Sequence, residues 1–189
     1  MNDRGDAERA TGLFGGAFDP PHSGHVALAA GAKRVFALPR LTVLVSADPG
    51  HKRTKCPPDV RLELARAAFP DDTVVLDPHP RTIDLLRTER YPRPLFVMGA
   101  DEFASFLSWK EPEAILELAE LAVGPRPGYP REALQPVLGR LDRPERVHFF
   151  EIPPNAASST AIRAGAAGEE LVTPAVAALI RQYGLYTGA

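Results

Sequence analysis

Short apolar runs alternate with longer stretches of helical period along most of the chain. The apolar runs are rich in Val, Leu and Phe and are bounded by turn residues, which is typical of β-strands. They cover residues 11–14, 41–46, 73–76, 94–98, 120–123 and 146–152. Helical patterns cover residues 23–38, 58–69, 82–90, 102–107, 111–119, 131–138, 159–166 and 173–183. The alternation predicts an α/β fold, a single-domain doubly wound parallel sheet with helices on both faces.

Polar and glycine-rich segments follow most of the predicted strands. Parallel strands covered by helices on both faces are almost continuously apolar, as they are here, and their sheets bind ligands beyond the carboxyl ends of the strands. The segments at those ends are residues 15–25, 48–55, 99–101, 124–128 and 157–163. Their recurrence indicates one active cleft. The remaining N-terminal residues, 1–10, are predicted to form a frayed tail, so the folded domain spans 11–189.

Composition narrows the class of protein. The chain has 189 residues, 44% hydrophobic and 24% charged, as in an ordinary globular domain with a substantial core. A net charge of −2 argues against a dedicated nucleic-acid binder. No run approaches the ~18 apolar residues of a membrane span, and the N-terminus lacks the apolar region of a secretory signal. We therefore expect a cytoplasmic protein with no nucleic-acid or membrane partner. The single cysteine, Cys56, is interpreted as an incidental loop thiol.

The segment at 15–25 reads Gly-Gly-Ala-Phe-Asp-Pro-Pro-His-Ser-Gly-His and leads from the first strand to the first helix. Glycines allow close approach of a ligand to the backbone, and a helix start offers N–H groups and a dipole to an anion. His22 and His25 could bind a metal, but no Cys, Asp or Glu cluster supplies the remaining ligands. A nucleophile or general base would need an orienting partner that the sequence does not show. Stabilisation of a phosphate anion is the interpretation that we favour.

Two other strand ends offer groups for a polyphosphate. Hydroxyls at the start of a predicted helix, followed by Arg163 one turn later, could clamp phosphates, although simple N-capping also explains the hydroxyls. These hydroxyls belong to Ser158, Ser159 and Thr160. Lys52 stands in a basic loop that could close over a triphosphate, and a solvated cluster of charges is equally compatible with it.

Asp101 and Trp109 each have two interpretations. Asp101 follows Gly99 at a strand end, where a carboxylate can accept hydrogen bonds from a ribose, and it could equally cap the next helix. Trp109 is either a core residue or a stacking platform for a planar ring, and the sequence slightly favours the core.

The segments at 15–25 and 158–163 together resemble the paired signature of the HxGH nucleotidyltransferase superfamily. Further motifs resemble the bacterial nicotinate-nucleotide adenylyltransferases within it: FDPPHSGH, HK at 51–52, GAD at 99–101, the later Trp109 and RPG at 126–128. The resemblance spans residues 12–186. The pair of signatures is highly specific, whereas GAD or RPG alone would be weak.

The resemblance implies a Rossmann-like nucleotidyltransferase fold and transfer of an adenylyl group from ATP to nicotinate mononucleotide, giving deamido-NAD and pyrophosphate. Mg²⁺ would be carried with ATP, with no metal ligand from the protein, and a homo-oligomer is compatible with the family. The residues implied in catalysis are His22, His25, Lys52 and Arg163. Those implied in ATP binding are Gly15, Gly16, Phe18, Gly99, Asp101, Ser158, Ser159 and Thr160. Those implied in acceptor binding are Thr82, Trp109 and Arg126.

Two departures from the family pattern lie on the acceptor side or in the basic loop. Arg81 precedes Thr82 where the family usually has an aromatic residue, and residues 48–50 replace a proline-rich run. Nicotinamide mononucleotide and phosphopantetheine therefore stay open as acceptors. A catalytically inactive nucleotide-binding module is a further alternative. Loss of His22, His25 or Arg163 would favour that alternative, but the chain retains all three. A metal-dependent hydrolase is favoured least.

Overall fold

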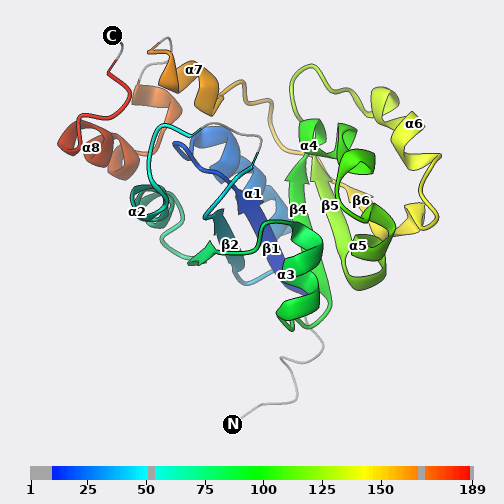
Figure 1. Cartoon of the computed structure of the whole chain (residues 1–189). Coiled ribbons are helices and arrows are strands. Elements are labelled where there is room, and N and C mark those ends of the chain that lie inside the picture. Colours follow the sequence, from blue (N-terminus) through cyan, green and yellow to red (C-terminus); the bar gives the residue numbers. More distant parts are fainter. Residues whose placement is uncertain (1–9, 51–53, 166–168, 188–189) are drawn as a thin grey trace.

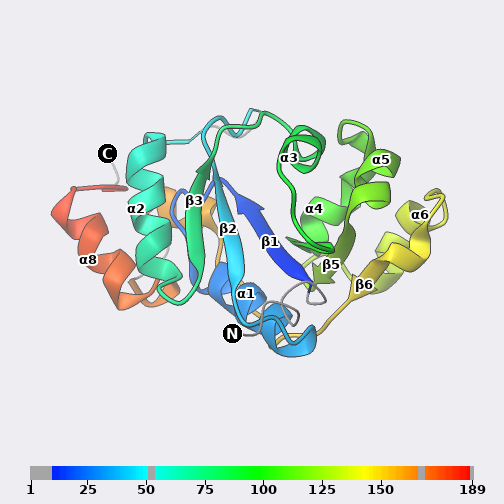
Figure 2. The same ribbon diagram turned by 90° about the horizontal axis from the view of Figure 1, so that it is seen from below.

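A six-stranded parallel sheet runs through the centre of the computed structural model, which describes residues 10–50, 54–165 and 169–187 (Figures 1 and 2). The strand order is β3-β2-β1-β4-β5-β6. The strands are β1 (Thr11–Gly16), β2 (Leu41–Ser46), β3 (Thr73–Asp77), β4 (Pro94–Gly99), β5 (Glu120–Gly124) and β6 (Val147–Phe149). Along the chain, β2 and β3 are added to one side of β1, and β4, β5 and β6 are then added to its other side. The neighbours β1 and β4 therefore mark the switch in strand order, beyond whose carboxyl ends such folds bind ligands.

Helices cover both faces of this sheet, which confirms the predicted doubly wound α/β class. One hydrophobic cluster joins alternate strand residues such as Phe14 and Val43 to α1 (Ser23–Val35), α2 (Pro58–Ala68) and α8 (Pro174–Gln182). A second cluster joins the intervening residues, such as Leu13 and Leu44, to α3 (Thr82–Thr88), α4 (Ala100–Ala104) and α5 (Pro112–Leu118). The period of two along each strand sends consecutive side chains to opposite faces, so one strand feeds both clusters.

Besides helices that end a few residues earlier than expected, such as α1 and α3, three predicted elements differ from the structure. The strand expected at 146–152 is only Val147–Phe149, and a 3-10 helix (Pro144–Arg146) precedes it. The segment that follows contains two consecutive prolines at 153–154, which cannot donate hydrogen bonds to a neighbouring strand. The helix expected at 131–138 divides into a 3-10 helix (Arg131–Leu134) and α6 (Gln135–Leu138), because Pro136 lacks the N–H that a continuous helix needs.

The helix expected at 102–107 is the third. It begins earlier, as α4, and gives way to a 3-10 helix (Phe106–Ser108). The hydroxyls of Ser105 and Ser108 donate to the carbonyl oxygens of Glu102 (2.9 Å) and Ser105 (2.6 Å) respectively. Such local bonds compete with the α-helical pattern.

The remaining helices of the described chain lie near its C-terminus: α7 (Ser159–Arg163), a 3-10 helix (Glu169–Leu171) and α8. The contacts of α8 with α2 bring the C-terminal segment back beside the first half of the sheet (Figure 1). No helix among the described residues combines the length and the apolar character needed to cross a bilayer. The predicted tail, apart from Ala10, lies outside the described residues.

Candidate active site

A cavity of about 1250 Å³ opens beyond the carboxyl ends of β1 and β4. Every predicted site residue that the structure describes lines it, whereas Lys52 lies outside the described residues. Pockets for single small ligands commonly measure roughly 300–1,000 Å³, so this one has room for two ligands side by side. The fold thus brings the predicted residues together, and their individual roles stay predictions.

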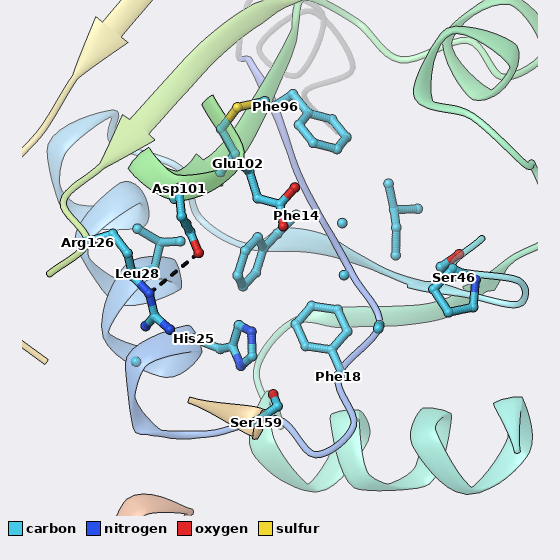
Figure 3. Close-up of a pocket in the computed structure, with 18 of the residues that line it drawn as sticks. Phe14, Phe18, His25, Leu28, Ser46, Phe96, Asp101, Glu102, Arg126 and Ser159 are labelled. Carbon is cyan, nitrogen blue, oxygen red and sulfur yellow. Dashed lines mark ion pairs between the residues drawn. The ribbon is translucent and has the colours of Figure 1, made fainter. Parts of the chain in front are cut away.

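The loop from β1 to α1 forms one wall, and aromatic packing explains its glycines. A Cβ atom on Gly16 would lie 2.9 Å from Cζ of Phe18, and one on Gly15 would lie 3.0 Å from Cζ of Phe96. Phe18 is 2% exposed and has a φ of +49°, a conformation that non-glycine residues rarely adopt. Its ring meets Phe14 edge to face at 5.4 Å (Figure 3). The glycines therefore let rigid rings line the cavity.

The two histidines begin α1 and contact each other. The backbone N–H of His22 donates to Nδ1 of His25 (3.2 Å), and the ring centroids lie 3.7 Å apart. Because Nδ1 of His25 accepts this bond, a neutral His25 ring carries its proton on Nε2. The His25 ring also meets the Phe18 ring at 5.1 Å (Figure 3). The fold thus fixes the tautomer in which neutral His25 can donate a hydrogen bond from Nε2.

His22 is held neutral at physiological pH. Its burial, to 4% exposure, lowers its pKa to about 4, and the positive charge of Arg126 contributes in the same direction. The ring lies in the cavity lining and keeps one N–H in its neutral form. It is therefore suited to hydrogen bonding with a ligand.

Helix α7 lies beside the β1–α1 loop and is tied to it by hydrogen bonds. The Ser158 hydroxyl accepts from the backbone N–H of Ala161 (3.1 Å), so the N-cap interpretation of Ser158 is confirmed. Ser159 Oγ donates to the carbonyl oxygen of Pro20 (2.8 Å). Arg163 donates from Nη1 to the carbonyl oxygen of Asp19 (2.7 Å) and from Nη2 to Thr160 Oγ1 (3.1 Å). Arg163 thus orders the loop while contributing its charge to the cavity lining.

Asp101 does not cap α4. The N-cap of that helix is Gly99, with no side-chain hydrogen bond, so the capping interpretation of Asp101 is wrong. The carboxylate instead lies 3.5 Å from Nε of Arg126, as the dashed line in Figure 3 shows. Arg126 also donates from Nη1 to the carbonyl oxygen of Ala157 (2.8 Å), just before α7. Arg126 therefore contacts Asp101 and the segment before α7, both of which the sequence assigned to ATP binding. The sequence had grouped Arg126 itself with Trp109 in acceptor binding.

Trp109 and Thr82 lie at the acceptor end of the predicted site. The Trp109 ring is half-buried and packs edge to face against Phe96 (6.3 Å) and at a tilt against Phe106 (5.5 Å). It packs against the second hydrophobic cluster and also lines the cavity, so the two interpretations of this residue are compatible. Thr82 opens α3, directly after Arg81, whose exposed guanidinium donates to the carbonyl oxygen of Pro80 (2.6 Å).

Four residues that the sequence did not assign to the site form a largely buried network beside it. They are Asp19, Cys56, Arg61 and Tyr186. Cys56 lies in the loop before α2, as expected, but it is 4% exposed and its thiol donates to the Tyr186 hydroxyl (3.1 Å). Asp19 stands within the recognised motif, but Arg61 lies in a helical pattern where an arginine is usually exposed. No local signal distinguishes it.

Among the described residues, no group of three or more His, Cys, Asp and Glu side chains is placed to hold a metal ion. The site instead offers imidazoles, hydroxyls and guanidinium groups, which suit phosphate oxygens.

Comparison with known proteins identifies the family of the chain. A family model described as cytidylyltransferase-like matches residues 13–165. A protein of Thermus thermophilus named "probable nicotinate-nucleotide adenylyltransferase" is 37% identical over 191 residues, which cover 93% of this chain and 98% of the relative. A protein of the same name from Desulfitobacterium hafniense is 32% identical over 197 residues, covering 93% and 94%.

Solved structures show the same fold. The Plasmodium falciparum nicotinic acid mononucleotide adenylyltransferase complexed with NaAD superposes with a TM-score of 0.76 at 17% identity, covering 96% of this chain and 98% of that one. The same enzyme complexed with APC gives a TM-score of 0.72 at 18% identity, with the same coverage. Fold, cavity and sequence similarity agree: the chain belongs to the cytidylyltransferase-like family and, within it, to the nicotinate-nucleotide adenylyltransferases, which are nucleotidyltransferase enzymes.

Proposed function

We propose that the protein transfers the adenylyl group of ATP to nicotinate mononucleotide, releasing pyrophosphate and forming deamido-NAD in NAD biosynthesis. The observation that carries this proposal is that one cavity, beyond the carboxyl ends of β1 and β4, is lined both by the residues expected to bind the ATP phosphates and by Trp109 and Thr82. The relatives that share 37% and 32% identity support the same acceptor by name.

In this reaction a phosphate oxygen of the acceptor attacks the α-phosphorus of ATP. A new oxygen–phosphorus bond forms, the bond between the α-phosphorus and the bridging oxygen breaks, and pyrophosphate leaves with the electron pair. The protein need only position the groups and stabilise the developing charge. A neutral imidazole keeps one N–H, so buried His22 and the Nε2–H tautomer of His25 can each donate a hydrogen bond to a phosphate.

The donor end supplies positive charge at fixed positions. Arg163 and Arg126 are both held by backbone carbonyl oxygens, so each guanidinium is oriented before ATP arrives. Mg²⁺ bound to ATP would neutralise part of the charge on its phosphates, held by phosphate oxygens. We include Lys52 in the triphosphate site from the family resemblance alone.

The acceptor end suits a planar ring with a substituent that accepts a hydrogen bond. Trp109 offers an aromatic face or edge, and Thr82 a hydroxyl at the start of α3. The cytoplasmic location and the homo-oligomer expected from the sequence stay predictions.

Pyrophosphate release from ATP and Mg²⁺ tests the proposal, with nicotinate mononucleotide, nicotinamide mononucleotide and phosphopantetheine as separate acceptors. We expect nicotinate mononucleotide to give the highest kcat/KM, by at least about tenfold, since a site built around an acceptor's polar group rejects analogues that lack it. Release without an acceptor measures background hydrolysis. No release with any of the three would overturn the enzymatic proposal, and a preference for another acceptor would replace the substrate.

A further inference from the structure

A tyrosine near the C-terminus reaches into the base of the phosphate end. The hydroxyl of Tyr186 donates to Oδ1 of Asp19 (2.7 Å) and accepts from Sγ of Cys56 (3.1 Å). Burial raises the pKa of both Tyr186 and Cys56, so both groups stay protonated and keep their donors. Tyr186 has a φ of +57° and follows α8, a helix that itself lines no part of the cavity.

Asp19 is the point on which these contacts converge. Its side chain is almost fully buried, at 1% exposure, and its Oδ2 accepts from the backbone N–H of Lys55 (2.6 Å). Its own carbonyl oxygen accepts from Arg163 Nη1. Asp19 directly follows Phe18, with its left-handed backbone, and precedes His22 by three residues. The position of this one carboxylate therefore bears on both the histidine loop and α7.

Arg61 fixes the same region from the other side. It is 1% exposed and donates to the carbonyl oxygens of Ala17 and Ser46 (both 2.8 Å) and of Cys56 (3.1 Å). Burial lowers the pKa of Arg61, and the negative charge of Asp19 opposes that shift. Two opposite charges buried together, each with hydrogen-bond partners, tolerate little displacement, because either one left unpaired is costly.

We propose that Tyr186 is a positioning residue for adenylyl transfer. Through Asp19 it fixes the loop that carries His22, and through Lys55 and Cys56 it fixes the segment that leads into α2. The inference rests on the proposed function. Its physical basis is that charge-stabilising donors work when they are preorganised, and small misplacements of them lower the rate much more than they lower binding.

The chain offers a matched control on the same segment. Tyr183 also donates its hydroxyl to a carboxylate, Oε2 of Glu63 (2.7 Å), but it is 41% exposed and lies outside the cavity lining and the buried network. Tyr183→Phe and Tyr186→Phe each remove one hydroxyl that donates to a carboxylate. A role in general stability predicts similar kinetics for the two variants, whereas a positioning role predicts a difference.

The first measurement is the steady-state kinetics of both variants alongside their thermal unfolding. We expect Tyr186→Phe to lower kcat about tenfold, with KM for the acceptor within about twofold of wild type, and Tyr183→Phe to leave both constants within about twofold. A kcat of Tyr186→Phe equal to that of Tyr183→Phe, with both variants folded, would overturn the proposal.

The second measurement does not depend on turnover. Cys56 is the chain's only cysteine, so its modification by a thiol reagent reports the opening of the network at one atom. In wild type we expect Mg²⁺ and a non-hydrolysable ATP analogue to slow modification at least about threefold, because a ligand bound against the β1–α1 loop suppresses local opening of the network that Asp19 anchors. In Tyr186→Phe modification should be faster and the effect of the analogue lost.

These outcomes separate the two proposals. Protection of wild-type Cys56 without deamido-NAD formation would leave the network intact and contradict the proposed function. Absence of protection in an enzyme that does form deamido-NAD would contradict the network. Should Tyr186→Phe not fold, Cys56→Ser and Cys56→Ala replace it: serine keeps a donor to Tyr186 and should retain a higher kcat than alanine. Equal kcat values in these two variants would count against the proposal.

Discussion

The proposed phosphate end and the proposed acceptor end of the cavity differ in burial and in hydrogen bonding. At the phosphate end, Asp19 and His22 are buried, and hydrogen bonds join the β1–α1 loop to α7, α2 and the C-terminal segment. At the acceptor end, Arg81 is exposed and Trp109 half-buried, and no side chain caps the start of α3. The contrast suggests that this fold fixes the groups that stabilise charge and leaves substrate selection to a more adaptable surface.

The physical reason lies in what each end must do. Stabilising a transition state requires donors already in place, since reorganising them during the reaction consumes the energy gained. Recognising a ring and its substituent tolerates small adjustments of side chains. Substitutions at the phosphate end should therefore act mainly on kcat, and those at the acceptor end mainly on the acceptor KM.

The most severe test of this contrast is His25→Ala. Losing a preorganised donor to a developing phosphate charge should lower kcat by about 10²–10³-fold, measured as pyrophosphate release, while circular dichroism and thermal unfolding show a folded protein. His148→Ala, which removes a half-exposed histidine paired with Glu120 (2.7 Å), is the control and should keep wild-type turnover. Normal turnover in His25→Ala would remove this histidine from the mechanism.

The buried state of His22 predicts a pH effect on stability. Its pKa is about 4 in the folded protein against 6.5 when exposed, so the unfolded chain binds a proton first as the pH falls. The stabilisation is complete above pH 6.5 and is lost progressively toward pH 4, amounting to up to about 3 kcal/mol. Urea unfolding of wild type and His22→Gln across this range measures it. The same dependence on pH in both proteins would show that His22 is not buried and neutral.

At the acceptor end, Trp109→Ala should raise the acceptor KM about tenfold, because it removes an aromatic surface worth roughly a kilocalorie per mole or more in ring contacts. The KM for ATP should change little. Trp109→Phe keeps a ring and is expected to recover most of the acceptor affinity. A loss of kcat at unchanged KM would instead place Trp109 with the phosphate end.

The smallest effect is expected from Arg81→Tyr, which restores the aromatic residue that the family usually has. Arg81 is exposed and donates to its neighbour's carbonyl oxygen, so we expect less than about a threefold change in the acceptor KM, as for most surface substitutions. Comparing nicotinate with nicotinamide mononucleotide measures the effect. A change of tenfold or more in their ratio would show that the guanidinium reads the acceptor's charge.

The sequence predicted the fold class and several of the segments that line the cavity for local reasons. Apolar runs and helical periods depend on neighbours a few residues apart, and the glycines and histidines at 15–25 stand together in one motif. Because parallel strands present their carboxyl ends at one edge, separate motifs could be assigned to one cleft before their contacts were known. Elements containing prolines or serines, such as 131–138 and 102–107, were less predictable, because single side chains interrupted the period.

The amino-acid sequence by itself determined the alternation of strands and helices, the phosphate-type motifs and the family. Only the tertiary structure decided which polar groups became buried partners. The bond from Tyr186 to Asp19 joins residues 167 positions apart, and Arg61 became buried through carbonyl oxygens from three different segments. Such partners are chosen when distant segments pack and buried charges must be satisfied, a requirement that leaves no local pattern in the chain.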